Sequence, residues 1–413
     1  MRRDKLSTVF IAILLIMAVP FTCTRRAGAS EFKVLHVFNW AKNPEGKLVM
    51  DAAGNLYGTT ANGGANGYGV VYKLVHNADG TWKATILHSF TGQDGSEPYA
   101  GMIFDAAGNL YGTTLSGGTG AGVVFKLAPN PGGTWTESVL HTFSWYADGF
   151  ESSAGLIFDA SGNLYGTTSA GSIYGFGAVF KLAPLPDGSW TESVLYAFTR
   201  GDGAYPKAGL VFDAAGNLYG TTELGGDMNC GDILYGCGTV FKLAHQPDGS
   251  WTESVLNRFC SLANCADGLY PWGGLIQDAA GNLYGMTDLG GSTGNGTVFK
   301  LAHQMDGSWT ESVLHNFCSF PACADGANPF YGSLVFDAAG SLYGTTMYGG
   351  CQGNGVVFKL TNTKSGWKET VLHTFSGYGT HPDSTLLVDR AGNVYGSVPE
   401  GSNNSGFVFE ITP

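Results

Sequence analysis

The sequence is poor in charged residues and in proline, and it shows no helical pattern. Charged side chains make up only 13% of the 413 residues, while aromatic side chains also reach 13%. A disordered chain would be charged and poor in aromatics, so this composition excludes general disorder. Proline (15) is far outnumbered by glycine (64), which supplies the positive φ angles of tight turns. These proportions are typical of many short strands joined by turns.

Basic residues and known catalytic motifs are also scarce. The formal net charge is −12, and without residues 1–29 the chain keeps 16 basic and 32 acidic residues, a net charge of −16. Such a chain repels phosphate backbones and has no basic stripe, which excludes nucleic acid as a partner. No H-E-x-x-H, P-loop or dinucleotide fingerprint is present. The motifs therefore identify no reaction.

Residues 1–29 have the features of a secretory signal peptide. A basic start precedes an apolar run at 8–21, and Ala27-Gly28-Ala29 is an A-x-A cleavage pattern. The run is too short to span a bilayer comfortably. We therefore expect a secreted or periplasmic protein that begins at Ser30 and has no stable membrane insertion after cleavage. Cys23 leaves a lipoprotein open as the alternative, although the residues before it are not small.

One ten-residue phrase recurs seven times. It reads DAAGNLYGTT at 51–60 and 105–114, DASGNLYGTT at 159–168, DAAGNLYGTT at 213–222, DAAGNLYGMT at 278–287, DAAGSLYGTT at 337–346 and DRAGNVYGSV at 389–398. Successive copies are 52 to 65 residues apart. A period this long indicates one supersecondary unit repeated in an array. Because the repeat fills residues 30–413, we expect a single domain there.

Each unit contains four strand signals in a fixed order. In the third copy these are GLIFD at 155–159, NLYGTT at 163–168, a segment like GVVFKL at 122–127, and one like TWTESVLHTF at 134–143. Four short antiparallel strands in each of seven units predict an all-β, seven-bladed β-propeller. A parallel β-helix is the alternative, but its rungs are usually much shorter than this period.

The two ends of the chain complement each other. EFKVLHVF at 31–38 matches the fourth strand of the unit, and GFVFEI at 406–411 matches the third. The last unit lacks a fourth strand of its own. We therefore predict that the N-terminal strand supplies it, which closes the ring and removes two exposed sheet edges.

The unit resembles the GloVer-type tandem repeat of secreted bacterial proteins. The resemblance rests on D-G-x-x-P, then G-L-x-x-D-x-x-G-N-L-Y-G-T-T, a G-G loop and G-x-V-F-K-L, and it covers nearly all of residues 30–413. It implies a propeller-like secreted protein, and it supplies neither catalytic residues nor a substrate. Proteins of that family commonly carry a C-terminal surface anchor. This chain ends inside its last strand signal, so we expect release into the periplasm or the medium.

Positions that recur in every unit are expected to serve the fold, because a catalytic group is normally needed once. One such set is the histidines of the fourth strand: His36, His88, His141, His315 and His373. Another is the aspartates that begin the repeated phrase, expected to cap local amides: Asp51, Asp105, Asp159, Asp213, Asp278, Asp337 and Asp389. A third is the tryptophans at the start of the fourth strand: Trp82, Trp135, Trp190, Trp251, Trp309 and Trp367.

The units differ mainly in two loops, those after the second and after the fourth strand. In a propeller these loops share one face, so we expect this varied face to bind a partner. Six cysteines lie there and predict three local disulfides, Cys230 with Cys237, Cys260 with Cys265 and Cys318 with Cys323. Zinc is the alternative for such spacings, although no histidine accompanies them. Cys351 is left over as a free thiol or an intermolecular link.

Aromatic and acidic residues on the varied face are the candidate binding residues. They are Trp145, Tyr146, Tyr235, Tyr270, Trp272, Tyr331, Tyr348, Asp148, Asp267 and Asp325. Aromatic platforms with carboxylate neighbours suit sugar rings. The plainer alternative is that the aromatics pack the loops and the aspartates form turns.

Two classes of function follow. The first is a binding or scaffold propeller for a glycan or an extracellular protein. The second is a polysaccharide hydrolase or lyase with carboxylates near the axis as acid and base. We expect a monomer without a cofactor or metal, with structural calcium in the acidic loops as the one open alternative.

Overall fold

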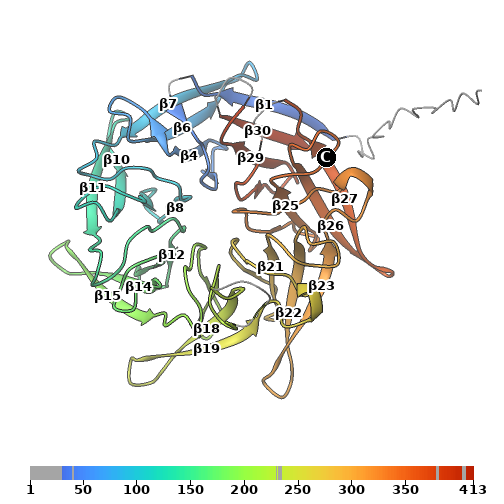
Figure 1. Ribbon diagram of the computed structural model, residues 1–413. Helices are drawn as coiled ribbons and strands as arrows, with labels where there is room; N and C mark the ends of the chain where they lie inside the picture. The colour runs from blue at the N-terminus through green and yellow to red at the C-terminus, as the bar shows by residue number, and fades with distance from the viewer. Residues whose placement is uncertain (1–29, 40, 229, 231–234, 378–380, 402–405) are drawn as a thin grey trace, which may run out of the picture.

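The computed structural model describes residues 30–413 apart from residues 40, 229, 231–234, 378–380 and 402–405. Seven four-stranded antiparallel sheets of this described part surround a central axis (Figure 1). The chain is therefore an all-β, seven-bladed propeller, as predicted. The expected signal peptide at 1–29 lies outside the described residues.

Each blade takes its strands in chain order from the axis outward. Blade 1 comprises β3 (Val49–Met50), β4 (Leu56–Thr60), β6 (Val70–His76) and β7 (Trp82–Ser89). Blade 2 comprises β8 (Ile103–Phe104), β9 (Leu110–Thr113), β10 (Val123–Pro129) and β11 (Trp135–Thr142). Blade 3 comprises β12 (Ile157–Phe158), β13 (Leu164–Thr168), β14 (Ala178–Pro184) and β15 (Trp190–Ala197). Blades 4 and 5 comprise β16 (Val211–Phe212), β17 (Leu218–Thr222), β18 (Thr239–His245) and β19 (Trp251–Arg258); and β20 (Ile276–Gln277), β21 (Leu283–Thr287), β22 (Thr297–His303) and β23 (Trp309–Asn316).

Blade 6 comprises β24 (Val335–Phe336), β25 (Leu342–Thr346), β26 (Val356–Thr363) and β27 (Gly366–Thr374). Blade 7 comprises β28 (Leu387–Val388), β29 (Val394–Val398), β30 (Phe407–Thr412) and, from the other end of the chain, β1 (Glu31–Val37). A short pair, β2 (Ala41–Lys42) with β5 (Asn62–Gly63), and two 3-10 turns, η1 (Ala263–Cys265) and η2 (Pro321–Cys323), lie in the loops.

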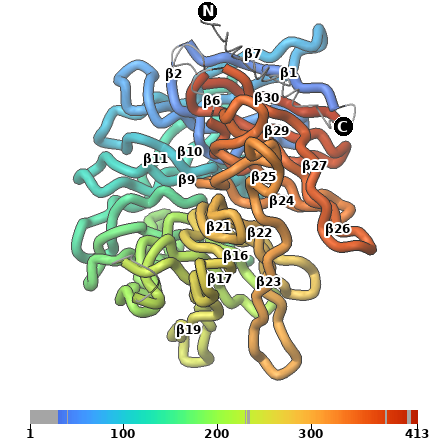
Figure 2. Tube along the Cα trace, turned by 45° about the vertical axis from the view of Figure 1, so that its right-hand side comes forward, coloured from blue at the N-terminus to red at the C-terminus, as the bar shows by residue number. Residues whose placement is uncertain are grey.

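The N-terminal strand closes the ring. β1 pairs antiparallel with β30 from Glu31 opposite Thr412 to Val37 opposite Phe407, and both views show the two strands side by side (Figure 2). Phe38, which follows β1, is fully buried and packs on Tyr72 of blade 1 with 4.8 Å between ring centroids. The predicted closure is thus confirmed, and it joins blade 7 to blade 1 through both hydrogen bonds and packing.

The repeated phrase is a hairpin organised by its aspartate. In blade 3, Asp159 Oδ1 accepts the amides of Ser161 and Asn163, both at 2.9 Å. Its Oδ2 accepts Asn163 Nδ2 at 2.6 Å and the Tyr165 hydroxyl at 3.0 Å. Burial alone would raise the pKa of Asp159, but these hydrogen bonds lower it overall. The predicted capping role is confirmed, and the Asn and Tyr of the phrase are explained as further donors.

Neighbouring blades are joined by aromatic pairs. Phe198 directly follows β15, the outer strand of blade 3. Its ring packs on Phe241 of blade 4 with 5.0 Å between ring centroids, and both side chains are fully buried. The glycine of the repeated phrase makes room for this ring, since a Cβ on Gly220 would lie 2.6 Å from Phe241 Cζ. The recurrent tryptophans also pack between blades, as predicted. For example, Trp251 of blade 4 packs on Tyr165 of blade 3 with 6.3 Å between ring centroids.

Two of the five recurrent histidines are held by aspartates of the following loop. His141 Nε2 lies 2.6 Å from Asp148 Oδ2, and His88 Nε2 lies 3.0 Å from Asp94 Oδ2. Tyr196 occupies the equivalent position in blade 3 and donates its hydroxyl to Asp202. These contacts support the structural role expected for the histidines.

Candidate functional site

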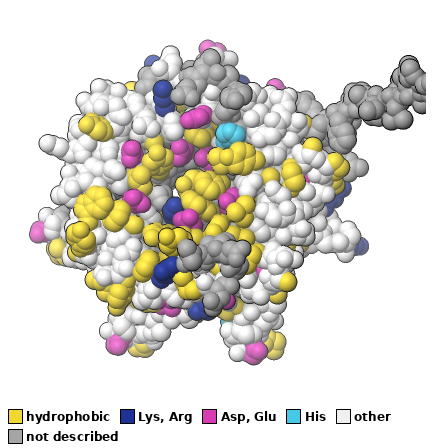
Figure 3. All heavy atoms as spheres, in the orientation of Figure 1, with side chains coloured by type: hydrophobic (Ala, Val, Ile, Leu, Met, Phe, Trp, Pro, Cys, Tyr) yellow, Lys and Arg dark blue, Asp and Glu magenta, His cyan; other side chains and the backbone are white. Residues whose placement is uncertain are grey.

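A cavity runs along the propeller axis and opens on the varied face. Its volume is about 780 Å³, and it is lined by residues that lead into the innermost strand of every blade. Figure 3 shows acidic, basic and hydrophobic side chains gathered around the central hollow of this face. A volume of this size lies within the range of small-ligand sites.

One position of the repeat supplies most of the polar groups at the mouth of this cavity. It lies six residues before the turn aspartate of each blade, and we call its residues the inner ring: Glu45, Tyr99, Ser153, Lys207, Trp272, Tyr331 and Asp383. All of them except Trp272 line the cavity, and Trp272 contacts Tyr331 with 5.0 Å between centroids. The inner ring carries six kinds of side chain in seven blades, whereas the hairpin beneath it hardly changes.

Two carboxyl groups of the inner ring interact. Asp383 is only 9% exposed, and its Oδ1 is buried without a hydrogen-bond partner. Burial raises the pKa of Asp383 well above its usual range, and the charges of Glu45 and Glu400 raise it further. Burial likewise raises the pKa of Glu45 to about 7, against the hydrogen bond that Asn43 Nδ2 donates to it at 3.3 Å. Glu45 can therefore hold or release a proton near neutral pH.

Two tyrosines lie beside this carboxyl pair, and a lysine lines the same cavity. Burial, then the charge of Glu45, raises the pKa of Tyr99 to about 12. The pKa of Tyr331 is raised by burial and then by Glu45. Lys47 also lines the cavity, where its side chain is exposed to the solvent of the channel. The surrounding protein still desolvates its ammonium group, and this desolvation lowers the pKa of Lys47. Both phenols therefore stay protonated and can donate hydrogen bonds.

A second cluster lies on the opposite part of the mouth. The Lys207 ammonium lies 3.0 Å from Glu223 Oε2 and 3.9 Å from the centroid of the Trp272 ring. Trp272 also packs on Phe330, with 4.3 Å between centroids. Glu223 begins the loop after the second strand of its blade, and burial raises its pKa despite the nearby lysine. The cluster combines an aromatic surface with a neutralised ion pair.

The aromatic residues predicted as binding residues divide into two groups. Trp272 and Tyr331 belong to the inner ring. Tyr270 lies half-buried two residues before Trp272. The other predicted aromatics do not line the cavity and are exposed: Trp145 (45%), Tyr146 (87%), Tyr235 (55%) and Tyr348 (44%). The structure therefore brings only part of the predicted set to the channel mouth.

The three predicted aspartates are buried within their loops. Asp148 accepts the amide of Ser144 at 2.8 Å in addition to its contact with His141. Asp267 accepts the amide and hydroxyl of Ser261 at 2.8 and 2.7 Å. Asp325 accepts the amide of Ser319 at 2.9 Å. These carboxylates organise the D-G turns, which matches the plainer alternative for them.

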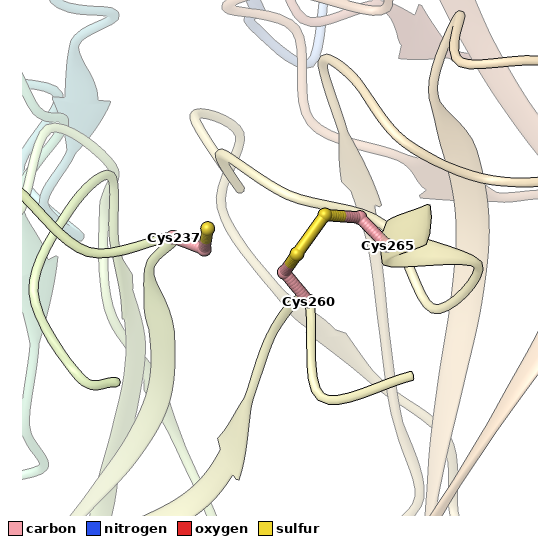
Figure 4. A group of neighbouring side chains, drawn as sticks. All are labelled: Cys237, Cys260 and Cys265. Atoms are coloured by element: carbon pink, nitrogen blue, oxygen red, sulfur yellow. A yellow bond between two sulfur atoms is a disulfide. The ribbon is translucent and has the colours of Figure 1, made fainter. Parts of the chain in front are cut away.

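The cysteines of the varied face are oxidised. The structure contains the three predicted disulfides, Cys230–Cys237, Cys260–Cys265 and Cys318–Cys323. Cys237 Sγ lies within 4.8 Å of the Cys260 and Cys265 sulfurs (Figure 4), but all three sulfurs are already in disulfides. The expectation of an unpaired Cys351 is wrong, because Cys351 is disulfide-bonded as well. Spacing along the chain reveals only partners in the same loop.

A further group with the geometry of metal ligands lies between blades 1 and 2. Ligand atoms of His88, Asp94 and Glu137 lie within 4.8 Å of one another. Asp94 already accepts the Thr91 amide at 2.7 Å and contacts His88. This group lies at the outer part of the blades, away from the axial cavity.

The sequence interpretation missed Glu45, Lys47, Tyr99, Lys207 and Asp383. The predicted binding residues were chosen from loops with insertions and cysteines, which are the longer loops of the chain. The missed residues lie in segments of nearly constant length, where only the side chain differs between blades. Comparison of the copies at a fixed distance from the turn aspartate would have revealed the inner ring.

The fold and its axial cavity define the class, a seven-bladed β-propeller with a divergent channel mouth. The chain belongs to the Gloeobacter/Verrucomicrobia repeat family, whose model matches residues 19–234 and 234–409. No curated protein matches the chain in sequence. No helix in the described part of the chain is long and apolar enough to cross a bilayer.

Solved structures share the fold at low sequence identity. A catalytically inactive variant of virginiamycin B lyase from Staphylococcus aureus, solved with quinupristin, is 14% identical with a TM-score of 0.55, and the match covers 93% of this chain and 99% of that one. A protein from Lactobacillus plantarum is 15% identical with a TM-score of 0.50, covering 80% and 84% of the two chains. These likenesses extend to the fold alone.

Proposed function

We propose that this protein is an exported binding propeller that recognises a glycan at the mouth of its axial channel. One observation carries the proposal: the inner ring differs from blade to blade within an otherwise repeated frame. A repeat needs no such variation to fold, because each blade packs in the same way. Variation confined to a concave, polar and aromatic mouth is what recognition of an asymmetric ligand requires.

The chemistry of the mouth favours a sugar over a protein partner. Trp272, Phe330 and Tyr331 form a contiguous aromatic cluster, and its Tyr331 ring lines the cavity, where the C–H face of a pyranose can stack. Glu45, Asp383 and Lys207 add hydrogen-bonding groups for hydroxyls within the same cavity. A cavity of about 780 Å³ accepts a few sugar units, whereas a protein interface of standard size needs about 800 Å² on each partner.

Export is supported by the oxidised cysteines. Disulfides persist in oxidising compartments and are rare where thiols are kept reduced. The pairs Cys230–Cys237, Cys260–Cys265 and Cys318–Cys323 all form between residues close in the chain. We therefore place the protein in the periplasm or the medium.

A glycan array followed by titration calorimetry tests the binding proposal. Trp272→Ala should abolish binding of the best glycan by removing the ring against which Tyr331 and Lys207 are held at the mouth. Trp145→Ala is the matched control, because Trp145 is exposed and packs on Phe150, which does not line the cavity, and it should leave affinity unchanged. If Trp145→Ala abolished binding and Trp272→Ala did not, the outer loops and not the channel would be the site.

A second candidate function is hydrolysis or elimination on a polysaccharide. The observation in its favour is the Glu45–Asp383 pair, since two carboxyl groups with raised pKa values, that of Glu45 about 7, suit general acid and base catalysis. The fold is also compatible with catalysis, as a lyase with the same architecture shows. Chain shortening by the purified protein that is lost in both Glu45→Gln and Asp383→Asn would establish this function, whereas binding without turnover would exclude it for that glycan.

A further inference from the structure

The carboxyl pair at the channel mouth lacks a cation. Neither Glu45 nor Asp383 forms an ion pair with a lysine, arginine or histidine of the described chain. Asp383 is nine-tenths buried, its Oδ1 accepts no hydrogen bond, and it borders the cavity. A buried carboxylate in this state is costly unless a positive partner arrives. The unpaired oxygen therefore points to a ligand group that the protein itself does not supply.

The opposite part of the same mouth shows how a cation is held there. Lys207 places its ammonium between the face of Trp272 and the Glu223 carboxylate, at 3.9 Å and 3.0 Å. Glu45 and Asp383 have comparable neighbours, because Tyr99 and Tyr331 line the cavity beside them. Carboxylate and aromatic groups together are a general solution for an organic ammonium ion. The set formed by Trp272 and Glu223 already holds the ammonium group of Lys207, whereas the set around Glu45 and Asp383 holds no ammonium group of the described chain.

We propose that Glu45 and Asp383 form a subsite for the ammonium group of an amino sugar, so that the glycan recognised is one with free amines. This inference rests on the proposed glycan site and names its chemical class. The acidic chain, with a net charge of −12, attracts such a cationic polymer from a distance. Neutral sugars gain only hydrogen bonds and no ionic contact from the carboxyl pair, and uronic acids are repelled by it.

A divalent metal ion is the competing cation. Calcium and magnesium take six or more oxygen ligands, several of them from the protein. In the described part of the chain, the groups of three or more side chains with metal-ligand geometry lie elsewhere, around Cys237 and around His88. Two carboxyl groups among phenol rings fit an ammonium better than a hard metal ion.

The subsite makes binding depend on pH. Asn43 donates to Glu45, the charge of Glu400 acts on both carboxyls, and Tyr99, Tyr331 and Lys47 complete the titratable surroundings. A cationic ligand favours the ionised pair, so the carboxyl groups lose protons when it binds. For a ligand amine that stays protonated, affinity should therefore rise as Glu45 ionises towards pH 7.

Titration calorimetry with three hexasaccharides tests the inference: glucosamine hexamer, N-acetylglucosamine hexamer and cellohexaose. The full mature chain should bind the glucosamine hexamer at least tenfold more tightly than the two neutral hexamers, with proton release in buffers of different ionisation enthalpy. Glu45→Gln and Asp383→Asn should each abolish this preference while weaker binding to the neutral hexamers persists. Glu31→Gln removes the same charge from an exposed position of β1 and should change nothing.

Each contrary result has a distinct meaning. Equal affinity for the three hexamers would overturn the ammonium subsite and leave the glycan site standing. If Glu31→Gln also lost the preference for the glucosamine hexamer, the preference would arise from the net charge of the protein and not from the carboxyl pair, and the inference would be overturned. Binding of none of the hexamers, with calcium chloride alone giving heat that Asp383→Asn abolishes, would overturn both proposals in favour of a metal site.

Discussion

At the scale of single residues, the channel mouth is held in a state that costs stability. Burial and the Glu45 charge raise the pKa of Asp383. A carboxyl with a raised folded pKa contributes stability that is present below the unfolded pKa and is lost as pH rises through the folded pKa. Binding sites often keep such unfavourable groups because a ligand relieves them. The inner ring fits this description, whereas the equivalent Ser153 of blade 3 carries no charge.

Asp383→Asn should therefore stabilise the protein at pH 8. The amide keeps the shape of the side chain, and it removes a buried charge that repels Glu45. At pH 4 both forms are neutral at this position, so their melting temperatures should agree. Thermal unfolding of the variant and the parent from pH 4 to pH 8 checks the prediction. A variant less stable than the parent at pH 8 would show that the ionised Asp383 has a stabilising partner.

At the scale of strands, the interfaces between blades carry a repeated acidic contact. A glutamate of the fourth strand lies near the aspartate of the preceding loop, and each has a buried, unpaired Oε1: Glu137, Glu192, Glu253, Glu311 and Glu369. Burial and then the neighbouring aspartate raise the pKa of the first four to about 7 and that of Glu369 to about 8. The same contact recurs because the same strand recurs.

These glutamates should make the propeller more stable in mild acid than at pH 8. Their folded pKa values are raised, so their contribution is present below the unfolded pKa near 4.3 and is lost as pH rises through about 7. Six of the turn aspartates, those of blades 1 to 6, act in the opposite sense, because their lowered pKa values make stability fall below about pH 4. We expect the highest melting temperature near pH 5.

Replacing all five glutamates by glutamine isolates the effect. Between pH 5 and pH 8 the melting temperature of this variant should fall less than that of the parent, while the loss of stability below pH 4 remains. Scanning calorimetry across the pH range provides the measurement. A parent protein that is most stable at pH 8 would contradict the assignment.

At the scale of the whole molecule, ring closure depends on one strand from the far end of the chain. β1 supplies the outer strand of blade 7, and Phe38 supplies the aromatic contact to blade 1. Removing β1 leaves β30 as an unpaired outer edge of blade 7, and removing the Phe38 ring leaves a gap in the packing between blades 7 and 1. The rest of the ring is joined by connections that are continuous in sequence, so this junction is its weakest point.

Phe38→Ala should lower the free energy of unfolding by about 3–5 kcal/mol, the usual cost of deleting a buried phenylalanine. Deletion of residues 31–38 should have a larger effect and promote aggregation. Phe320→Ala is the control, because Phe320 is 52% exposed and its truncation should be nearly neutral. Chemical denaturation of the three proteins gives the comparison. A deletion variant as stable as the parent would contradict the closure.

The fold could be predicted almost completely from the repeat, but the site could not. Asp159, Asn163 and Tyr165 recur with fixed spacing, and their hydrogen bonds are local, so the sequence displays them directly. Tyr331 and Trp272 were found because they are aromatic residues near cysteine-rich loops. Lys207 and Glu223 were missed because their ion pair joins two different loops, the one before β16 and the one after β17. Neither residue is unusual in its own segment of the sequence.

The sequence by itself determined the number of blades, the strand order, the disulfide-bearing loops and the complementarity of the two ends. All of these depend on contacts within a repeat or on a pattern that repetition makes visible. Only the tertiary structure decided that seven positions in different blades, Glu45 and Asp383 among them, meet around one axis. The physical reason is that their convergence comes from closing a ring of more than three hundred residues, and burial and charge at the mouth exist only once that ring is closed.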